Sequence, residues 1–373
     1  MKIALIHMRH ANSGGTELFL NHLSKYLAEK GEDVTIICRS HVEPSHPAIK
    51  FVKLRPFSIG KAHRIWRFAK AVEKHVKASN YDFVYGLGKT WTHDMLRIGG
   101  GTALHHLKYV KRSKLNLKNK IAVKIEKKAM AAGAYQHIVT NSYKSAEEVV
   151  EVYQVPANKM SVIHNFVDTH RFDRKRVSSE AQLVRSELAI DHQKKVFLFL
   201  GTGYERKGLK QTLEAFSKLD INACLLIVGR DSHLDDYKKM AENLGVFESC
   251  KFLGESNKPE IYFSIADCYV LPALYEPFGF TVIEALACGT PVVTSYNCGA
   301  KEVLNSSIAT VIDQSNDIDQ LAAGMTKWAE MKGNDSLQKQ CRELALTLDV
   351  EVIMGKNYQQ ILSIHHSKNN AND

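Results

Sequence analysis

The sequence predicts an α/β protein of two doubly wound domains, each built on a parallel sheet, and three observations support this prediction. The chain has 373 residues, more than one hydrophobic core usually serves. Short apolar runs typical of buried strands alternate with amphipathic segments of helical period. A polar, charge-rich stretch at residues 173–193 separates two such series. We therefore expect domains at residues 1–168 and 169–348, and a final helix with a frayed tail at 349–373.

The first domain is expected to open with a strand, a glycine loop, a helix and a second strand. The strands are predicted at residues 2–7 and 34–38, and the helix between them is predicted to be capped by Thr16. The loop contains Gly14 and Gly15, without the G-x-G-x-x-G spacing of a dinucleotide site. Two interpretations stay open here: a tight turn that needs small residues, or backbone N–H groups that approach a ligand.

The rest of the first domain contains a second glycine-rich segment. Strands are expected at 51–54, 81–87, 135–140 and 160–163, and helices at 65–78 and 145–153. Between them, three glycines at 99–101 precede His105 and His106. The glycines before this histidine pair indicate a loop near a ligand, and either histidine could hydrogen-bond a hydroxyl of that ligand. Two surface histidines would give the same pattern.

The second domain opens with a continuous apolar strand at 196–201, followed by Arg206, Lys207 and a helix. Two cations at the start of a helix suit a phosphate-sized anion. Further strands are expected at 224–229 and 251–254. Helices are expected at 234–244, 259–266, 318–332 and 337–347.

Two carboxylates follow the buried strand that we predict at 266–272. Glu276 lies in the loop before the next helix, and Glu284 is expected in the first turn of that helix, with Thr281 as its N-cap. An ionised carboxylate can accept two hydrogen bonds from a sugar diol, and the helix N-terminus suits a phosphate. The spacing thus indicates a nucleotide-sugar site. The alternative is a surface loop in which Glu284 closes a capping box with Thr281.

The run Glu-Pro-Phe-Gly-Phe at 276–280, a second glutamate after seven intervening residues, and Gly-Thr-Pro-Val-Val at 289–293 form a specific motif. It resembles the E-x7-E signature of retaining glycosyltransferases of the GT-B fold, family 4, and in particular the bacterial enzymes that build lipopolysaccharide cores. The resemblance implies two Rossmann-like domains facing across a cleft. It also implies hexose transfer from a UDP-sugar, with the nucleotide sugar as co-substrate and no other cofactor.

The resemblance also implies roles for individual residues. Lys207 and Arg206 would bind the diphosphate, and Glu284 would hold the ribose diol. Glu276, with the backbone of Phe278, Gly279 and Phe280, would hold the hexose. In the first domain, backbone N–H groups at Gly14 and Gly15 would approach the donor, while His105 or His106 matches a looser family pattern. The chain departs from the family at Thr202, where an arginine is usual, and at Phe166, where a glycine is usual.

Charge is distributed unevenly along the chain. Residues 1–165 carry 27 lysines and arginines against 12 acidic residues, whereas the remainder carries 23 against 28. Nine of these cations lie between Lys108 and Lys128, interleaved with aliphatic residues and opposed only by Glu126. Such a segment can bind an anionic membrane surface. A solvated helix packed on its own domain is the alternative. Nucleic acid is a weaker one, because the segment lacks the aromatic residues of single-strand binders.

Other features narrow the function classes. No run reaches the ~18 apolar residues of a membrane span, and no secretory signal is visible, so we expect a cytoplasmic protein at the inner membrane face. The seven cysteines form no C-x-x-C pair, and no D-x-D motif stands in a suitable context, so we expect no metal. A glycolipid or oligosaccharide acceptor is expected. A GT-B epimerase and a non-catalytic membrane-binding protein remain alternatives.

Overall fold

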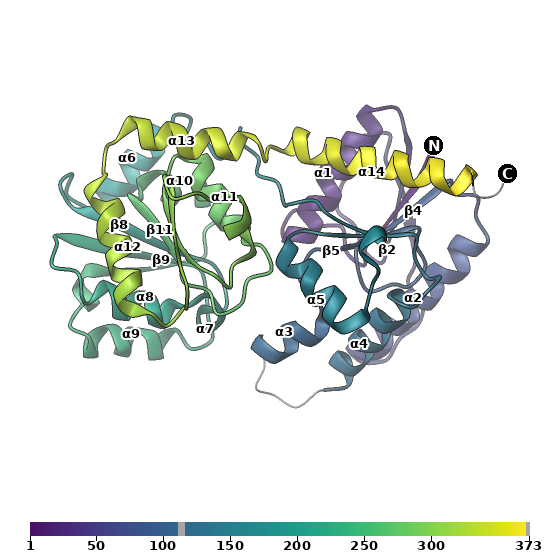
Figure 1. Cartoon of the computed structure of the whole chain (residues 1–373), viewed down its shortest axis with the longest axis horizontal. Helices are drawn as coiled ribbons and strands as arrows, with labels where there is room; N and C mark the ends of the chain where they lie inside the picture. The colour runs from purple at the N-terminus through teal and green to yellow at the C-terminus, as the bar shows by residue number, and fades with distance from the viewer. Residues whose placement is uncertain (111–115, 371–373) are drawn as a thin grey trace. The chain divides into compact units, whose positions relative to one another are not determined.

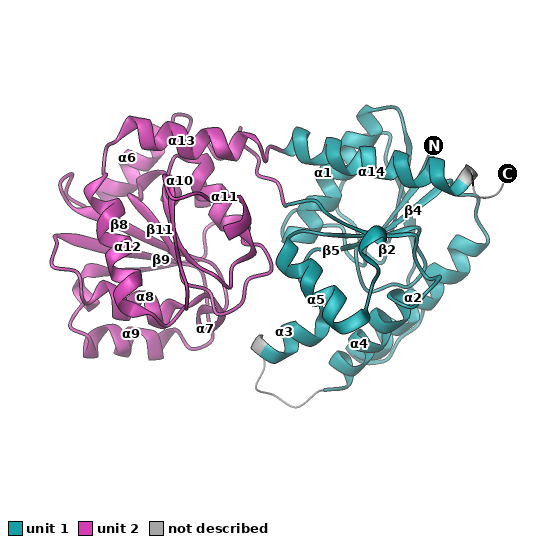
Figure 2. Cartoon of the chain, in the orientation of Figure 1, with its two compact units in different colours: residues 1–164, 350–373 teal, residues 165–349 magenta. Residues whose placement is uncertain are grey.

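The structure is a computed structural model that describes residues 1–110 and 116–370. Contacts divide the chain into two compact units, Met1–His164 with Val350–Asp373, and Asn165–Asp349 (Figure 2). Residues 165–168 thus pack with the second unit, although the sequence boundary assigns them to the first. No helix in the described residues is both long and apolar enough to cross a bilayer.

The first unit is built on a parallel sheet of seven strands in the order β3-β2-β1-β4-β5-β6-β7. Its strands are β1 (Lys2–Ile6), β2 (Asp33–Cys38), β3 (Lys50–Lys53), β4 (Phe83–Gly86), β5 (Met95–Ile98), β6 (His137–Thr140) and β7 (Met160–Val162). The order reverses direction between β1 and β4, and the crevice at the carboxyl ends of such strands is where ligands bind. The Gly14 loop follows β1, so it lies at this edge.

Helices cover this sheet, and Figure 1 shows α14 lying along α1. The helices are α1 (Gly15–Glu29), α2 (Gly60–Lys77), α3 (Ala103–Val110), α4 (Leu117–Ala129), α5 (Tyr143–Tyr153) and α14 (Val350–Asn370). The buried Tyr85 hydroxyl donates to Asn357 Oδ1 at 3.1 Å, which fixes α14 on the first unit. The prediction that Thr16 caps α1 is wrong. Gly14 is the N-cap, at φ +104°, because the chain turns sharply after β1.

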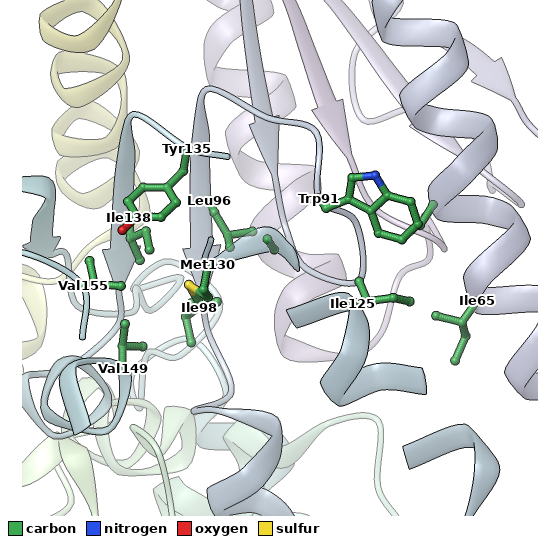
Figure 3. Close-up of a cluster of buried hydrophobic side chains, with 12 residues drawn as sticks. Ile65, Trp91, Leu96, Ile98, Ile125, Met130, Tyr135, Ile138, Val149 and Val155 are labelled. Atoms are coloured by element: carbon green, nitrogen blue, oxygen red, sulfur yellow. The ribbon is translucent and has the colours of Figure 1, made fainter. Parts of the chain in front are cut away.

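A cluster of buried apolar side chains joins α2, α4 and the strands β5 and β6 (Figure 3). Ile65 and Ala69 of α2 meet Ile125 and Ala129 of α4 there, with Trp91 beside them. Helix α4 therefore buries part of its apolar face in its own unit, while its five lysines remain exposed.

The second unit contains a parallel sheet of six strands in the order β10-β9-β8-β11-β12-β13. Its strands are β8 (Lys195–Leu200), β9 (Ala223–Val228), β10 (Cys250–Gly254), β11 (Cys268–Leu271), β12 (Val292–Ser295) and β13 (Ala309–Ile312). The switch point falls between β8 and β11. The loops after these two strands carry Lys207 and Glu276, so the topology places the two sequence motifs side by side.

The helices of the second unit are α6 (Ser178–Glu187), α7 (Tyr204–Lys207), α8 (Leu209–Phe216), α9 (Leu234–Asn243), α10 (Pro259–Ile265), α11 (Phe280–Ala287), α12 (Ile318–Glu330) and α13 (Asp335–Leu346). Sequence reasoning missed α3, α6, β5 and β13. Each of these four elements is short, so it gives little periodic signal. Helix α6 also exposes most of its residues, and no apolar stripe marks it in the sequence. The predicted fold class is confirmed in both units.

Candidate functional site

The centre of the candidate site is a carboxylate that holds two cations. Arg206 Nη1 donates to Glu276 Oε2 at 2.8 Å, and Lys207 Nζ donates to the same oxygen at 3.1 Å. Arg206 Nη1 also donates to the backbone oxygen of Tyr275 at 2.7 Å, and the Leu274 N–H donates to the Arg206 carbonyl at 2.8 Å. These contacts tie the loop after β8 to the loop after β11.

Glycines around α7 bring Lys207 to this position. The four-residue helix lies between Gly203 and Gly208, both in the left-handed region, where residues with a Cβ are strained. The Lys207 side chain passes directly over Gly201, whose φ is +145°. A Cβ there would lie 2.5 Å from Lys207 Cε. Gly201 therefore makes the space in which the lysine stem is buried, with Lys207 only 8% exposed.

The charge balance of the cluster favours an anion. Burial would raise the pKa of the Glu276 carboxyl, but Lys207 and Arg206 outweigh it and lower this pKa to about 2. Glu276 is therefore ionised at neutral pH and neutralises one of the two cations. One positive charge remains, beside the N-terminus of α11.

The loop from Pro277 to Phe280 presents backbone to the same place. Gly279 is the N-cap of α11 at φ +104°, and a Cβ there would lie 2.9 Å from Cys298 Sγ. The Phe278 carbonyl accepts a hydrogen bond from the Ala300 N–H at 2.7 Å, so the segment around Ala300 holds the loop in place. The first N–H groups of a helix have no partner within the helix, which leaves those at the start of α11 suited to an anion or a hydroxyl.

The predicted capping by Thr281 is wrong. The hydroxyl of Tyr269 donates to Thr281 Oγ1 at 2.7 Å, and no side chain of the described residues caps α11. Because α11 starts at Phe280, Glu284 lies beyond its first turn and closes no capping box with Thr281. Burial raises the pKa of Glu284 to about 7, with Arg171 and Lys207 opposing the shift and Glu260 adding to it. A carboxyl that is close to half protonated at neutral pH can both donate to and accept from a diol.

The first unit contributes its own group of predicted residues. Gly15 begins α1, and the Leu18 N–H donates to the Gly14 carbonyl at 2.9 Å. A Cβ on Gly14 would lie 2.4 Å from Glu17 Oε2. Glu17 pairs with Arg9 at 2.7 Å. Sequence reasoning missed Arg9 and Glu17, although an acidic residue in the first turn of a helix was a visible signal.

The three glycines at 99–101 lie in a loop, and both histidines lie in α3, the helix that follows this loop. Helix α3 begins directly after the glycine run, because buried carboxylates satisfy its start: Glu126 accepts the Ala103 N–H at 2.9 Å. His105 Nδ1 lies 2.9 Å from Thr102 Oγ1, and its Nε2 lies 3.3 Å from Glu151 Oε2. His106 is exposed.

The basic segment at 108–128 is only partly described. Lys111, Arg112 and Lys114 lie outside the described residues, whereas the five lysines of α4 are exposed. Within residues 1–110 and 116–370 no group of three histidine, cysteine or acidic side chains is placed to hold a metal ion. The seven cysteines are free and buried, as expected for small apolar residues.

Comparison with known proteins places the chain in a family. Residues 13–171 match the family model described as Glycosyltransferase Family 4, and residues 181–347 match Glycosyl transferases group 1. The uncharacterized glycosyltransferase MJ1607 of Methanocaldococcus jannaschii is 26% identical over 353 residues, 88% of each chain. The lipopolysaccharide glucosyltransferase WaaG of Escherichia coli is 21% identical over 328 residues, 86% of this chain and 87% of WaaG.

Solved structures share the whole architecture. The crystal structure of WaaG, a glycosyltransferase involved in lipopolysaccharide biosynthesis, matches with a TM-score of 0.81 at 20% identity, covering 96% of this chain and 99% of that one. Anabaena HepE, solved in complex with UDP-glucose, matches with a TM-score of 0.73 at 18% identity, covering 97% and 100%. The two parallel-sheet units therefore have the GT-B fold. The chain belongs to the family 4 glycosyltransferases, also described as group 1, a retaining family.

Proposed function

We propose that this glycosyltransferase moves a hexose from a UDP-sugar to a lipopolysaccharide-core or related glycolipid acceptor, with retention at the anomeric carbon. The observation that carries the proposal is the Arg206–Lys207–Glu276 cluster at the carboxyl ends of β8 and β11. HepE, which shares the fold, has been solved with UDP-glucose, and this supports a UDP-linked donor.

The cations supply what the leaving group needs. As the bond from the anomeric carbon to the diphosphate breaks, negative charge grows on the departing phosphate oxygens. Lys207 and Arg206 neutralise that charge, and the N–H groups at the start of α11 add to them. The acceptor hydroxyl attacks the anomeric carbon on the face from which the diphosphate departs, and its proton passes to the leaving phosphate.

The two glutamates are assigned to different parts of the donor. Glu276 fixes both cations through one oxygen, Oε2. We assign its other oxygen, together with the backbone of residues 278–280, to the hexose hydroxyls. Glu284 lies deeper in α11 and binds the ribose diol.

The first unit is assigned the acceptor. Its excess of lysine and arginine suits an acceptor that carries anionic groups or lies at an anionic membrane. In this proposal the N–H groups at Gly14 and Gly15 approach the donor, and His105 or His106 contacts a hydroxyl. The enzyme acts without a metal ion and on the inner face of the cytoplasmic membrane.

A thermal-shift screen tests the donor. We expect UDP-glucose or another UDP-hexose to raise the melting temperature, and GDP-mannose to have less effect. If none of the nucleotide sugars raises the melting temperature, the proposal is contradicted. Loss of transfer activity in EDTA would contradict the metal-independent mechanism. A GT-B epimerase is the second candidate, because it would use the same donor site. Conversion of the UDP-sugar to its epimer without any acceptor would favour it.

A further inference from the structure

We propose that a cavity at the amino edge of the sheet of the second unit binds a small organic phosphate, as a site separate from the proposed donor site. The cavity has a volume of about 340 Å³, which is within the usual range for small-ligand sites. It lies between α6, the end of α10 and the start of α13, three helices that Figure 1 shows in one part of the second unit.

The cavity and the proposed donor site lie at opposite edges of the sheet. The cavity is lined by Asp267, directly before β11, and by Pro291, directly before β12. The donor cluster of Arg206, Lys207 and Glu276 instead follows the carboxyl ends of β8 and β11. None of the described residues that line the cavity belongs to that cluster. The sugar donor therefore does not account for this cavity.

The wall of the cavity is short of negative charge. Arg174, Arg185 and Lys332 line it, whereas Asp267 is the one acid among the described lining residues. Lys332 Nζ lies 3.4 Å from Asp267 Oδ2, and the same oxygen accepts the Val196 N–H at 2.8 Å. Because Asp267 can neutralise only one of the three cations, two positive charges of the wall remain unbalanced.

Two buried polar groups of the wall have unused hydrogen-bonding capacity. Arg185 Nη2 donates to the Asp191 carbonyl at 2.6 Å and to the Lys194 carbonyl at 3.1 Å, but the buried Arg185 Nε has no hydrogen-bond partner among the described residues. The buried Ser264 hydroxyl has none either, and the neighbouring Cys288 thiol is a weak acceptor. Buried polar groups are nearly always hydrogen-bonded, so unsatisfied groups at a cavity point to a ligand.

The cations of the wall also repel one another. Burial lowers the pKa of the Lys332 ammonium, Asp267 opposes this shift, and the nearby Arg185 adds to it. Lys332 Nζ is held by the Lys194 carbonyl at 2.7 Å, the same carbonyl that Arg185 uses. Two cations that share one carbonyl lie close together, and an anion bound between them offsets their repulsion.

The lining fits a phosphate ester better than a carboxylate or a free phosphate. A phosphate monoester carries a charge of about −1.5 to −2 near neutral pH, which matches the two unbalanced cations, whereas a carboxylate carries only one charge. Ile265 and Leu337, both buried, and the partly exposed Met331 form an apolar part of the lining. This part suits the organic group of the ester, which inorganic phosphate lacks.

Arg174 connects this cavity with the helix of the proposed donor site. Its Nε donates to the carbonyl of Cys288, the C-cap of α11, at 2.8 Å. Helix α11 begins at Gly279 in the proposed donor site, and a helix of eight residues is about 12 Å long. Because anions at its two ends repel each other, we expect the ester and UDP to weaken each other's binding by the same factor, roughly two- to tenfold. This consequence rests on the proposed function, whereas binding in the cavity does not.

Titration calorimetry with phenyl phosphate tests the site, because this monoester joins a phosphate to an apolar ring. We expect saturable binding to the wild type, and much weaker binding of benzoate and of inorganic phosphate. Lys332→Met retains an unbranched stem and removes one cation, so it should bind phenyl phosphate roughly 10-fold or more weakly. Lys332→Arg restores the charge and should retain most of the affinity.

Two further variants serve as controls. Lys327→Met is the matched one, because Lys327 also donates to a backbone carbonyl, that of Ser306 at 3.3 Å, and is not among the described lining residues. It should keep the wild-type affinity. Lys207→Met should bind phenyl phosphate normally and lose affinity for UDP, whereas Lys332→Met should show the reverse. If the wild type binds phenyl phosphate in this pattern but does not bind UDP, the proposed function fails and the cavity site stands.

Four outcomes would overturn the inference: no binding of phenyl phosphate, equally tight binding of benzoate, equal losses in Lys332→Met and Lys327→Met, or loss of the ester in Lys207→Met. The last outcome would place the ester in the donor site. Met331→Glu adds an acid at an exposed position of the wall and should also weaken ester binding, so it serves if Lys332→Met does not fold. A UDP affinity that phenyl phosphate leaves unchanged would refute the coupling through α11.

Discussion

Replacing Lys207 by methionine tests the centre of the proposed donor site. Lys207 is 8% exposed, and its Nζ lies 3.1 Å from Glu276 Oε2. Methionine retains an unbranched apolar stem that can lie over Gly201, and it removes only the charge. The substitution therefore separates the electrostatic role of Lys207 from its packing.

The expected loss in donor affinity follows from one charge-assisted contact. Such a contact contributes about 1.5–3 kcal/mol, which corresponds to a UDP affinity roughly 10- to 150-fold lower. The loss in kcat/KM for transfer should be larger, because the contact strengthens as charge develops on the leaving diphosphate.

Stability should fall as well, and its pH dependence identifies the cause. The pKa of Glu276 is about 2, against an ordinary value of 4.5. This difference is equivalent to about 3 kcal/mol of stability at pH 7, shared between two cations. Because Arg206 remains, we expect the variant to lose part of this energy, and the pKa of Glu276 to move up toward its ordinary range.

Titration calorimetry with UDP, transfer rates and urea unfolding between pH 2 and pH 7 measure these effects. Lys210→Met is the matched control, since Lys210 lies in the next helix and is 56% exposed. It should retain wild-type affinity and stability. A folded Lys207→Met protein with near-normal UDP affinity and turnover would refute the assignment of Lys207 to the diphosphate.

Three further predictions concern the residues around Lys207. Glu276→Gln should lower the unfolding free energy by about 3 kcal/mol at pH 7. Most of this difference should be lost as the pH falls from about 4.5 to 2, where the wild-type carboxyl becomes half protonated in the folded protein; a difference that stays at its pH 7 size at pH 2 would contradict this origin. The pH dependence of stability that Glu284 causes has the opposite sign. Because its folded pKa is about 7, wild-type stability decreases as pH rises from about 4.5 to 7. Glu284→Gln should therefore be more stable than wild type at pH 8, by up to about 3 kcal/mol, yet bind UDP more weakly; unfolding curves at pH 4.5 and pH 8 measure this. Gly201→Ala should displace Lys207, because the new Cβ would lie 2.5 Å from its Cε, and should reduce UDP affinity as much as Lys207→Met does; calorimetry on both proteins compares them.

Much of the fold could be predicted from the amino-acid sequence. Apolar runs located most strands of both sheets, since strands buried on both faces must be continuously apolar. The glutamates at 276 and 284, with the glycine between them, also predicted the candidate site of the second unit. These are local properties, because side-chain chemistry and spacing along one segment are enough to detect them.

Helix starts were predicted less well, for a physical reason. Thr16 and Thr281 are good capping residues by preference, yet Gly14 and Gly279 take the N-cap positions. At both places the chain must turn sharply from a strand into a helix, with φ at +104°, and only glycine accepts this angle without strain. The threonine hydroxyl in α11 instead accepts a hydrogen bond from Tyr269, a partner twelve residues earlier.

The partners of the charged residues could not be predicted from the sequence, because they depend on how distant segments pack. The order of the strands places β8 beside β11, and this brings Lys207 to a carboxylate that lies 69 residues later in the chain. The same fold gives two glutamates of one motif opposite pKa shifts: Glu276 is buried against two cations, and Glu284 is buried without a direct ionic partner among the described contacts. Both residues are glutamates of one motif, and the difference between their pKa values arises from burial and neighbouring charge, which are set by packing.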